Sequence, residues 1–491
     1  MEARRRPLKL RGGTWLWLTV FVFCAAGCGS NLKKPKSDKK PIILKTQYDD
    51  ARAGRDVAEQ VKAEMGFYPD PRLNAYVRQI GIKLVRYAPL QPFDYTFTIV
   101  DQPMPNAFAL PGGYIYISRG LIALTNSEDE LANVIGHEIT HAAARHSAAQ
   151  QEIARRSPPL AMPHLRMAKL AAYGRDQERD ADQGGQFLAS SAGYDPMGMS
   201  TFLRKLGNVE RQNLGYSRLT GYFDTHPGST ERAATAANRA RGVQFQANDA
   251  SRAGHAAYLK RINGVVLDTN PAEGIFLGNV FVHPDIGFHM RFPGGWRLRN
   301  TPSAVGASSP DGEAMIFATL EGKGNNAQEG SKAFIEKHGE EYGVEIEAEG
   351  PVRVGELDGW RMQTLGYMQG RRVAANLTFV PFGGFIFRLT VVAPPRSADK
   401  YLGRGRASVR SFGPITKKER DAVKVTRLEV VTALEGESLG ELGKRTGNDY
   451  SSQETAILNG VFSDVRFREG DPVKIAKSYP YAGGSAKNPG L

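Results

Sequence analysis

The chain has 491 residues, which is too long for one hydrophobic core, so two to four domains are expected. Its formal net charge of +13 arises mainly in residues 1–11 and 33–40, each with five basic residues against one acidic residue, and only +5 is spread over the remainder. No basic patch with interleaved aromatic residues stands out, which disfavours nucleic-acid binding, and the only two cysteines are Cys24 and Cys28, which excludes a disulfide in the body.

The first residues have the anatomy of a secretory signal. A basic start precedes an apolar run, residues 14–26, that is too short for a comfortable membrane span. Small residues then lead into Cys28, a pattern that resembles a bacterial lipobox. We therefore expect a signal peptide at residues 1–27 and a lipidated Cys28 followed by a lysine-rich linker to residue 44. Gly29 after the cysteine implies a periplasmic body on a Gram-negative outer membrane, and the alternative is an ordinary cleaved signal.

Two helices and two strands are expected next. Residues 48–87 carry apolar side chains at spacings of three and four, with Pro69–Pro71 as a break between two helices. Residues 93–100 alternate and are β-branched or aromatic, which predicts a strand. A Pro-Gly-Gly turn then leads into a second strand, Tyr114–Ser118.

This second strand is a candidate substrate site. An extended peptide can pair its backbone with an exposed sheet edge, which needs no particular substrate sequence. The alternative is a hairpin strand that serves only the core. The residues expected to contact substrate are Asn106, Gly112, Gly113, Tyr114 and Ile115.

The stretch Ser127–His146 predicts one amphipathic helix. Ser127 and Glu130 form a capping-box pattern at its start. His137 and His141 lie one turn apart on such a helix, so both imidazoles can bind one metal ion. Glu138 projects beside them, where its carboxylate can reach a metal-activated water. This arrangement is typical of zinc peptidases.

A second predicted helix carries Glu178 and Asp182, four residues apart and therefore on one face. Catalytic zinc takes three protein ligands, and two histidines with one glutamate is a standard set. Glu178 is the candidate third ligand. Asp182 is a candidate acceptor for the free N–H of a zinc-bound imidazole. The alternative is a solvated helix whose charges exchange salt bridges.

These motifs together resemble one known family. The pattern His137-Glu-x-x-His141, then Glu178-x-x-Ala-Asp182, preceded by Asn106-Ala-Phe-Ala-x-Pro-Gly-Gly113, is similar to the zinc metallopeptidases that include the CAAX prenyl protease and HtpX. The likeness is greatest to the soluble periplasmic branch of BepA-like lipoprotein proteases and runs from Gly54 to Asn238. It implies a mainly helical gluzincin fold with a small sheet, one Zn²⁺ per chain, and Glu178 as ligand.

A later segment, residues 223–232, also matches the family's His-Pro…Arg pattern. His226 is a candidate catalytic residue that either donates to the oxyanion or binds zinc in the resting state. Arg232 either helps to stabilise the same charge or pairs with a carboxylate. Both are therefore assigned to the active site.

The remainder predicts two further units after a peptidase domain at residues 45–250. Residues 242–268 have the character of a connecting segment. Residues 275–415 predict an α+β domain with an antiparallel sheet for packing or substrate presentation. Its strand-like runs are residues 288–292, 314–320, 375–380 and 384–393, around a helical stretch at residues 327–342.

Residues 425–480 resemble a LysM module. Gly436–Leu439 is similar to its Gly-Asp-Thr-Leu turn, and Leu458–Gly460 is similar to its Leu-Asn-Gly. The resemblance implies a strand, two helices and a strand that bind peptidoglycan, and a purely structural βααβ cap is the alternative.

The sequence therefore predicts an exported, lipid-anchored α+β zinc endopeptidase. Glu138 is expected to act as general base, and misfolded or unassembled envelope proteins are the expected substrates. The rival hypothesis is a cell-wall-binding scaffold or chaperone whose zinc site is shut by a fourth ligand. Proteolysis that requires Glu138 would separate the two.

Overall fold

The computed structural model describes residues 47–147, 163–212, 226, 229–368 and 370–483. The expected signal peptide, the lipidation site Cys28 and the lysine-rich linker lie outside these residues. Among the helices within these ranges, none is both long enough and apolar enough to cross a membrane.

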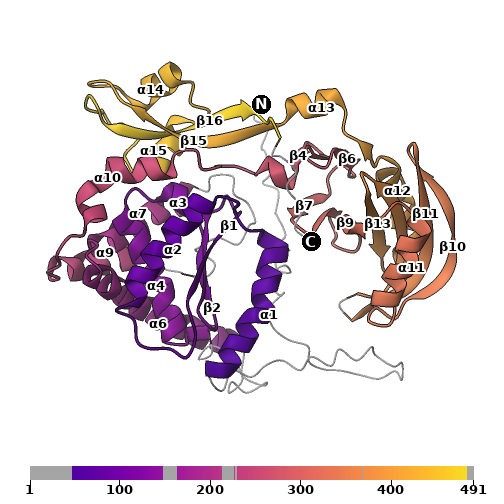
Figure 1. Ribbon diagram of the computed structural model, residues 1–491, viewed down its shortest axis with the longest axis horizontal. Coiled ribbons are helices and arrows are strands. Elements are labelled where there is room, and N and C mark those ends of the chain that lie inside the picture. Colours follow the sequence, from indigo (N-terminus) through magenta and orange to yellow (C-terminus); the bar gives the residue numbers. More distant parts are fainter. Residues whose placement is uncertain (1–46, 148–162, 213–225, 227–228, 369, 484–491) are drawn as a thin grey trace, which may run out of the picture.

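The N-terminal half is mainly helical and occupies one side of the molecule (Figure 1). The expected break at Pro69–Pro71 separates its first two helices, and Asp70 caps the second through the N–H groups of Arg72 and Leu73. The helices are α1 (Gln47–Met65), α2 (Pro71–Val85), α3 (Arg119–Leu124), α4 (Glu128–Ala143), α6 (Pro163–Ser191), α7 (Met197–Gln212), α9 (Ser229–Arg241) and α10 (Asp249–Ile262).

A small sheet lies against these helices in the order β1-β3-β2. Its strands are β1 (Thr96–Val100), β2 (Ala107–Leu110) and β3 (Tyr114–Ser118), with β3 parallel to β1 and antiparallel to β2. The strand expected at residues 114–118 therefore forms, but it is central and its backbone is paired on both sides. The expectation that it offers an exposed edge is wrong, because β2 takes that edge.

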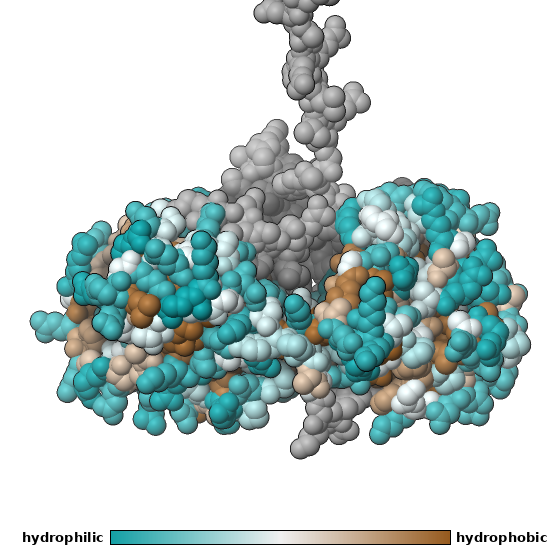
Figure 2. Space-filling view, turned by 90° about the horizontal axis from the view of Figure 1, so that it is seen from above, coloured by the Kyte–Doolittle hydropathy of each residue, from teal (hydrophilic) through white to brown (hydrophobic). Residues whose placement is uncertain are grey.

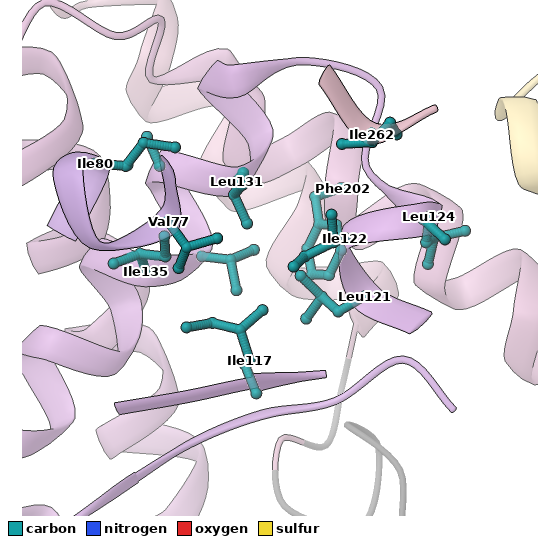
Figure 3. Close-up of a cluster of buried hydrophobic side chains, with 14 of the residues drawn as sticks. Val77, Ile80, Ile117, Leu121, Ile122, Leu124, Leu131, Ile135, Phe202 and Ile262 are labelled. Carbon is teal, nitrogen blue, oxygen red and sulfur yellow. The ribbon is translucent and has the colours of Figure 1, made fainter. Parts of the chain in front are cut away.

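The main core lies between the sheet and the helices. Aliphatic side chains from α2, β3, α3 and α4 meet there and are almost completely buried (Figure 3). Val77 and Ile80 reach it from α2, and Leu131 and Ile135 reach it from α4. Each such side chain contributes roughly 1.5–3 kcal/mol when fully buried, so this core holds α4 firmly in place.

The segment at residues 242–268 differs from the expected connector. It contains α10, whose Tyr258, Leu259 and Ile262 are buried in the main core. The helical pattern was hard to see because Gly254 interrupts it with a non-helical φ of 68° and few apolar residues remain. The main core of the N-terminal unit therefore continues beyond residue 250.

The next unit, coloured orange in Figure 1, is built on antiparallel strands as expected. One sheet has seven strands in the order β10-β11-β12-β13-β9-β8-β7, and another has four in the order β14-β6-β5-β4. The strands are β4 (Ile275–Leu277), β5 (Val280–His283), β6 (Phe288–Arg291), β7 (Arg297–Thr301), β8 (Ala304–Ser308), β9 (Met315–Lys323), β10 (Glu345–Val354), β11 (Leu357–Met368), β12 (Arg371–Phe382), β13 (Phe385–Ala393) and β14 (Gly413–Pro414).

Three helices accompany these sheets: α11 (Ala327–His338), α12 (Ala398–Arg410) and α13 (Lys417–Ala422). The expected helix at residues 327–342 thus ends at His338, four residues early. A separate core of aromatic and aliphatic side chains joins the two sheets. The face seen from above in Figure 2 is largely hydrophilic, with hydrophobic residues in small patches.

The C-terminal segment has the expected order of strand, two helices and strand: β15 (Lys424–Thr432), α14 (Leu439–Thr446), α15 (Ser452–Asn459) and β16 (Pro472–Pro480). The two strands pair antiparallel and run beside α10 (Figure 1). Several of its apolar residues, including Leu428 and Ile457, belong to the same core as the N-terminal helices. This unit is therefore packed against the N-terminal unit through a shared core.

One buried lysine joins the two parts. The Nζ atom of Lys474 in β16 donates to the carbonyl oxygens of Ala123, Leu124 and Thr125, at 2.7, 3.3 and 3.0 Å. These carbonyls end α3, immediately before the cap of α4. The carbonyl groups at a helix C-terminus lack partners within the helix, so the N–H groups of Lys474 complete the junction that leads into α4.

Candidate metal centre

Helix α4 begins with a partial capping box. The Oγ atom of Ser127 accepts the N–H of Glu130 at 3.1 Å, as the pattern predicts. The carboxylate of Glu130 does not return to Ser127 but accepts the N–H of Asn126 at 2.6 Å. The helix ends at Ala143, so the expectation of one helix through to residue 146 is wrong in its last turn.

Three glycines let α6 approach α4 closely. A Cβ atom on Gly136 would lie 2.9 Å from the carbonyl oxygen of Gly185, and one on Gly185 would lie 2.7 Å from the amide nitrogen of His137. A Cβ atom on Gly184 would collide with Thr140 at 2.5 Å. This contact places the carboxylates of α6 directly opposite the histidines of α4. Pro163 is the first residue of α6, where proline is tolerated.

Four side chains converge between these helices. The Nε2 atoms of His137 and His141 are 3.0 Å apart, and the Nδ1 atom of His226 lies 3.2 Å from Nε2 of His137. The carboxylate of Glu178 lies 2.9 Å from Nδ1 of His226 and 3.3 Å from Nε2 of His141. One ligand atom from each of the four residues thus lies within 4.8 Å of the others.

This cluster fits zinc. Four ligand atoms at 2.0–2.1 Å from a tetrahedral zinc ion are separated by about 3.3 Å, close to the separations just given. Burial lowers the pKa of His137 to about 3, so its imidazole stays neutral and able to bind a cation. Burial opposes the charge on Glu178, but the facing His226 and hydrogen bonds from His141 and His226 outweigh it and hold the pKa of this carboxyl well below its usual value.

Glu138 lies beside the cluster with a fully buried side chain. Neither of its carboxylate oxygens forms a hydrogen bond of ordinary geometry within the described ranges, and their polar neighbours are the amide of Ala109 and Nε2 of His226, which lies 3.5 Å from Oε1. Burial raises the pKa of Glu138 to about 8. An orphaned buried carboxyl is costly, and a water molecule between Glu138 and a metal ion would satisfy it.

Asp182 and Arg232 surround the ligands. An oxygen of Asp182 lies 3.0 Å from Nδ1 of His137. Arg232 donates two hydrogen bonds to Asp182, at 2.7 and 2.8 Å, and its third nitrogen lies 2.7 Å from Glu178. Burial favours a neutral Asp182, but the hydrogen bonds from Arg232 and His137 prevail and lower the pKa of this carboxyl. Of the two roles expected for Arg232, this geometry favours pairing with carboxylates.

The residues expected to contact substrate lie inside the small sheet or in its β2–β3 turn. Ile115 is completely buried within the sheet, and Asn106 is buried with its N–H on the Oγ atom of Ser118. Gly112 and Gly113 form the β2–β3 turn with φ of 84° each, and Tyr114 begins the central strand. These residues shape the hairpin, while the neighbouring edge strand β2 faces the ligands.

The backbone of β2 turns two residues toward the metal cluster. The N–H of Ser118 donates to the carbonyl of Asn106 at 2.8 Å, so the hydrogen-bonded pairs with β3 recur at Phe108 and Leu110. The alternate residues Ala107 and Ala109 therefore direct their backbone polar groups to the edge away from β3. The carbonyl oxygen of Ala107 lies 3.3 Å from Nε2 of His226, and the amide of Ala109 faces Glu138. Sequence reasoning missed this edge because strand order is not a local property.

Sequence reasoning also gave no role to His146. Its Nδ1 atom lies 2.8 Å from Nδ1 of His141, on the side of that ring opposite the cluster. Histidine is scarce, with nine in the chain, and His146 follows His141 by only five residues. This short spacing was the sequence feature that could have suggested a role for His146 near the metal ligands.

Comparison with known proteins agrees with this geometry. The model of peptidase family M48 matches residues 71–240. The beta-barrel assembly-enhancing protease of Escherichia coli (strain K12) is 31% identical over 205 residues, which cover 37% of this chain and 42% of that protein. The mitochondrial metalloendopeptidase OMA1 of Schizosaccharomyces pombe is 26% identical over 215 residues, covering 39% and 63%, and that of Arabidopsis thaliana is 34% identical over 157 residues, covering 29% and 31%.

The likeness is confined to the segment that carries the metal cluster. The matched stretch spans less than half the length of the Escherichia coli relative. Within it lie the two histidines of α4, Glu138, the carboxylates of α6 and the His226–Arg232 segment. Through residues 71–240, this chain is similar to peptidase family M48.

Proposed function

We propose that this chain is a zinc-dependent endopeptidase that cuts unfolded or misassembled proteins of the bacterial envelope. The observation that supports it most is the convergence of His137, His141, Glu178 and His226 beside the orphaned carboxyl of Glu138. A purely structural zinc site needs the four ligands but has no use for an unpartnered buried carboxyl.

In the proposed reaction, the metal ion and the side chains of the protein have different roles. A zinc ion bound by His137, His141 and Glu178 would act as a Lewis acid on a water molecule and on the scissile carbonyl. Glu138 takes a proton from the water as its oxygen adds to the peptide carbonyl, and then passes that proton to the amide nitrogen, so that the C–N bond breaks and the amine leaves. Asp182, held by Arg232, orients His137.

Edge strand β2 is the proposed substrate platform. The outward N–H and C=O groups of Ala107 and Ala109 can pair with an extended peptide and bring its backbone beside Glu138. Backbone pairing reads no side chains, which suits unfolded substrates of varied sequence. The printed name of the Escherichia coli relative, a beta-barrel assembly-enhancing protease, supports envelope proteins as the substrate class.

His226 has a place in this proposal as a resting ligand. Its Nδ1 atom lies in the cluster while its Nε2 atom contacts the carbonyl of Ala107, so it occupies both the fourth coordination position and the substrate edge. A catalytic zinc site needs that fourth position open for water. His226 therefore restrains the enzyme until it leaves.

Removal of the metal tests the proposal. Zinc-stripped protein should fail to cleave casein, and one equivalent of Zn²⁺ should restore cleavage. Zinc at a hundred times its dissociation constant adds about 2.7 kcal/mol of stability, so stripping should lower the thermal midpoint by roughly 5–10 °C. Stoichiometric zinc binding without any cleavage by the wild type or the variant below would favour the scaffold reading.

Replacement of His226 separates its two expected roles. If it is the resting ligand, His226→Ala should cleave casein faster than wild type, by roughly tenfold, because the fourth position and the edge of β2 are freed. Zinc affinity should fall, because one ligand is lost. Casein hydrolysis and competition with a chromogenic chelator measure the two effects. A loss of cleavage with unchanged zinc affinity would instead assign His226 to the oxyanion.

Anchoring and glycan binding belong to the same proposal. We propose that the body is periplasmic and tethered to the outer membrane through Cys28, and that the C-terminal βααβ unit can contact peptidoglycan. Within that unit, the Leu-Asn-Gly part of the motif faces inward: Asn459 accepts the Nδ2–H of Asn126 on its carbonyl. Any glycan surface must therefore use its exposed loops, where Leu434 and Phe462 are 52% and 85% exposed. Sedimentation with insoluble peptidoglycan tests this contact.

A further inference from the structure

A backbone turn after α4 directs the chain back onto the metal centre. Arg145 has φ of 55°, and no other non-glycine residue of the described ranges has a positive φ. Side chains disfavour this left-handed conformation, which occurs chiefly where the surrounding structure requires it. The turn brings His146 against His141, and the side chain of His146 is only 10% exposed.

Both the imidazole ring and the backbone carbonyl of His146 make polar contacts. Its Nδ1 atom lies 2.8 Å from Nδ1 of His141, with the rings edge to face at 80°. Its Nε2 atom lies 3.3 Å from a carboxylate oxygen of Asp180, and its backbone carbonyl accepts the side-chain N–H of Gln177 at 2.9 Å. Gln177 and Asp180 belong to α6, the helix that also supplies the ligand Glu178.

These contacts define one tautomer for each ring. The Nε2 atom of His141 faces the other ligand atoms, so a neutral ring in that role carries its proton on Nδ1. That N–H can donate only to an acceptor, so His146 must present an unprotonated Nδ1 and carry its own proton on Nε2. The Nε2–H then donates to Asp180. Each group in this row, from His141 through His146 to the solvent-exposed Asp180, therefore has a donor facing an acceptor.

The two histidine ligands are thus supported differently. His137 faces Asp182, a buried carboxylate neutralised by Arg232. His141 faces an imidazole whose own partner is 63% exposed. A ligating histidine needs a partner for its second nitrogen to keep ring orientation and tautomer, and removal of such partners typically lowers metal affinity 10- to 100-fold.

We propose that His146 is a positioning residue that orients the metal ligand His141 through an imidazole–imidazole hydrogen bond relayed to Asp180. The inference deepens the proposed function and rests on its metal site. In this proposal, the left-handed turn at Arg145 brings the side chain of His146 against His141.

Three substitutions of His146 test the geometry. His146→Asn keeps an acceptor near the position of Nδ1, His146→Gln places its amide farther out, near the position of Nε2, and His146→Leu removes both. The readouts are zinc affinity by chelator competition and the visible absorption of the Co²⁺-substituted protein, neither of which requires catalysis. His338→Asn, in α11 of the other unit, is the control for loss of a histidine.

The expected result is a zinc affinity 10- to 100-fold weaker for His146→Gln and His146→Leu, with an altered Co²⁺ spectrum, and a value within threefold of wild type for His146→Asn and His338→Asn. Asp180→Asn, at an exposed position, should fold normally and weaken zinc by only a few fold. Equal affinities for all His146 variants would overturn the proposal, and so would an Asn variant as weak as the Leu variant. If wild type binds zinc but never cleaves, the proposed function fails while this comparison still stands.

Discussion

Glu138→Gln should abolish proteolysis while zinc remains bound. The amide has nearly the same shape as the carboxyl but cannot accept and return a proton, so hydrolysis of casein should fall by about a thousandfold. Glu138 is not one of the four clustered ligands, so the zinc content should stay at one per chain. Initial rates with a fluorescent casein, together with metal analysis of the same preparation, measure both quantities.

A second variant shows whether the loss of activity comes from the missing catalytic carboxylate or only from the loss of a buried negative charge on α4. Glu130→Gln lies on the same helix and is also buried, but its carboxylate contacts Asn126 and Lys205 rather than the metal cluster. It should lose stability and retain most of its rate per folded molecule. If Glu138→Gln kept a tenth or more of the wild-type rate, Glu138 would not be the general base.

Lys474→Met should destabilise the peptidase domain, although residue 474 lies far from it in sequence. The methionine side chain fills a similar volume but leaves the carbonyls of Ala123 and Thr125 buried without a donor. These are backbone groups, so no companion substitution can remove them, and we expect a loss of about 3–5 kcal/mol. Chemical denaturation followed by circular dichroism measures the change in unfolding free energy.

Lys477→Met serves as the comparison in the same strand. Its side chain is 39% exposed, and its amine lies 4.0 Å from Glu429, so its removal should cost less than about 1 kcal/mol. Equal midpoints for the two variants would show that the contacts of Lys474 with α3 contribute little. Zinc affinity should also decline in Lys474→Met, because α3 leads directly into the metal helix.

The metal ligands on α4 could be found in the sequence because helical spacing alone brings His137 and His141 together. Glu178 needed the family resemblance, since its own charged surroundings are equally typical of a solvated helix. The sequence does not show why α4 and α6 meet. Their close approach depends on Gly136 and Gly185, which have no side chain to keep the helices apart.

The order of the small sheet could not be predicted. Tyr114–Ser118 has the composition of a strand, but its central place depends on a parallel pairing with β1 across an intervening strand. His146 was missed for a related reason. An arginine in the left-handed region is rare, so nothing in the pattern near Arg145 indicates that the chain turns back there.

The C-terminal unit was correctly predicted in its order of elements, but its burial was not. A lysine in an alternating strand ordinarily points into solvent, and Lys474 is buried only because α3 ends opposite it. The acceptors are supplied by a segment about 350 residues earlier. No local pattern records such a pairing.

That separation has a consequence for how the protein matures. Synthesis proceeds from the N-terminus, so the helix with the candidate metal ligands emerges long before the strand whose lysine completes the junction at its start. The contact between Lys474 and the end of α3 can therefore form only after residue 474 has been synthesised. We therefore expect a molecule that ends before β16 to hold the start of α4, and with it the candidate metal ligands, less firmly than the full chain does.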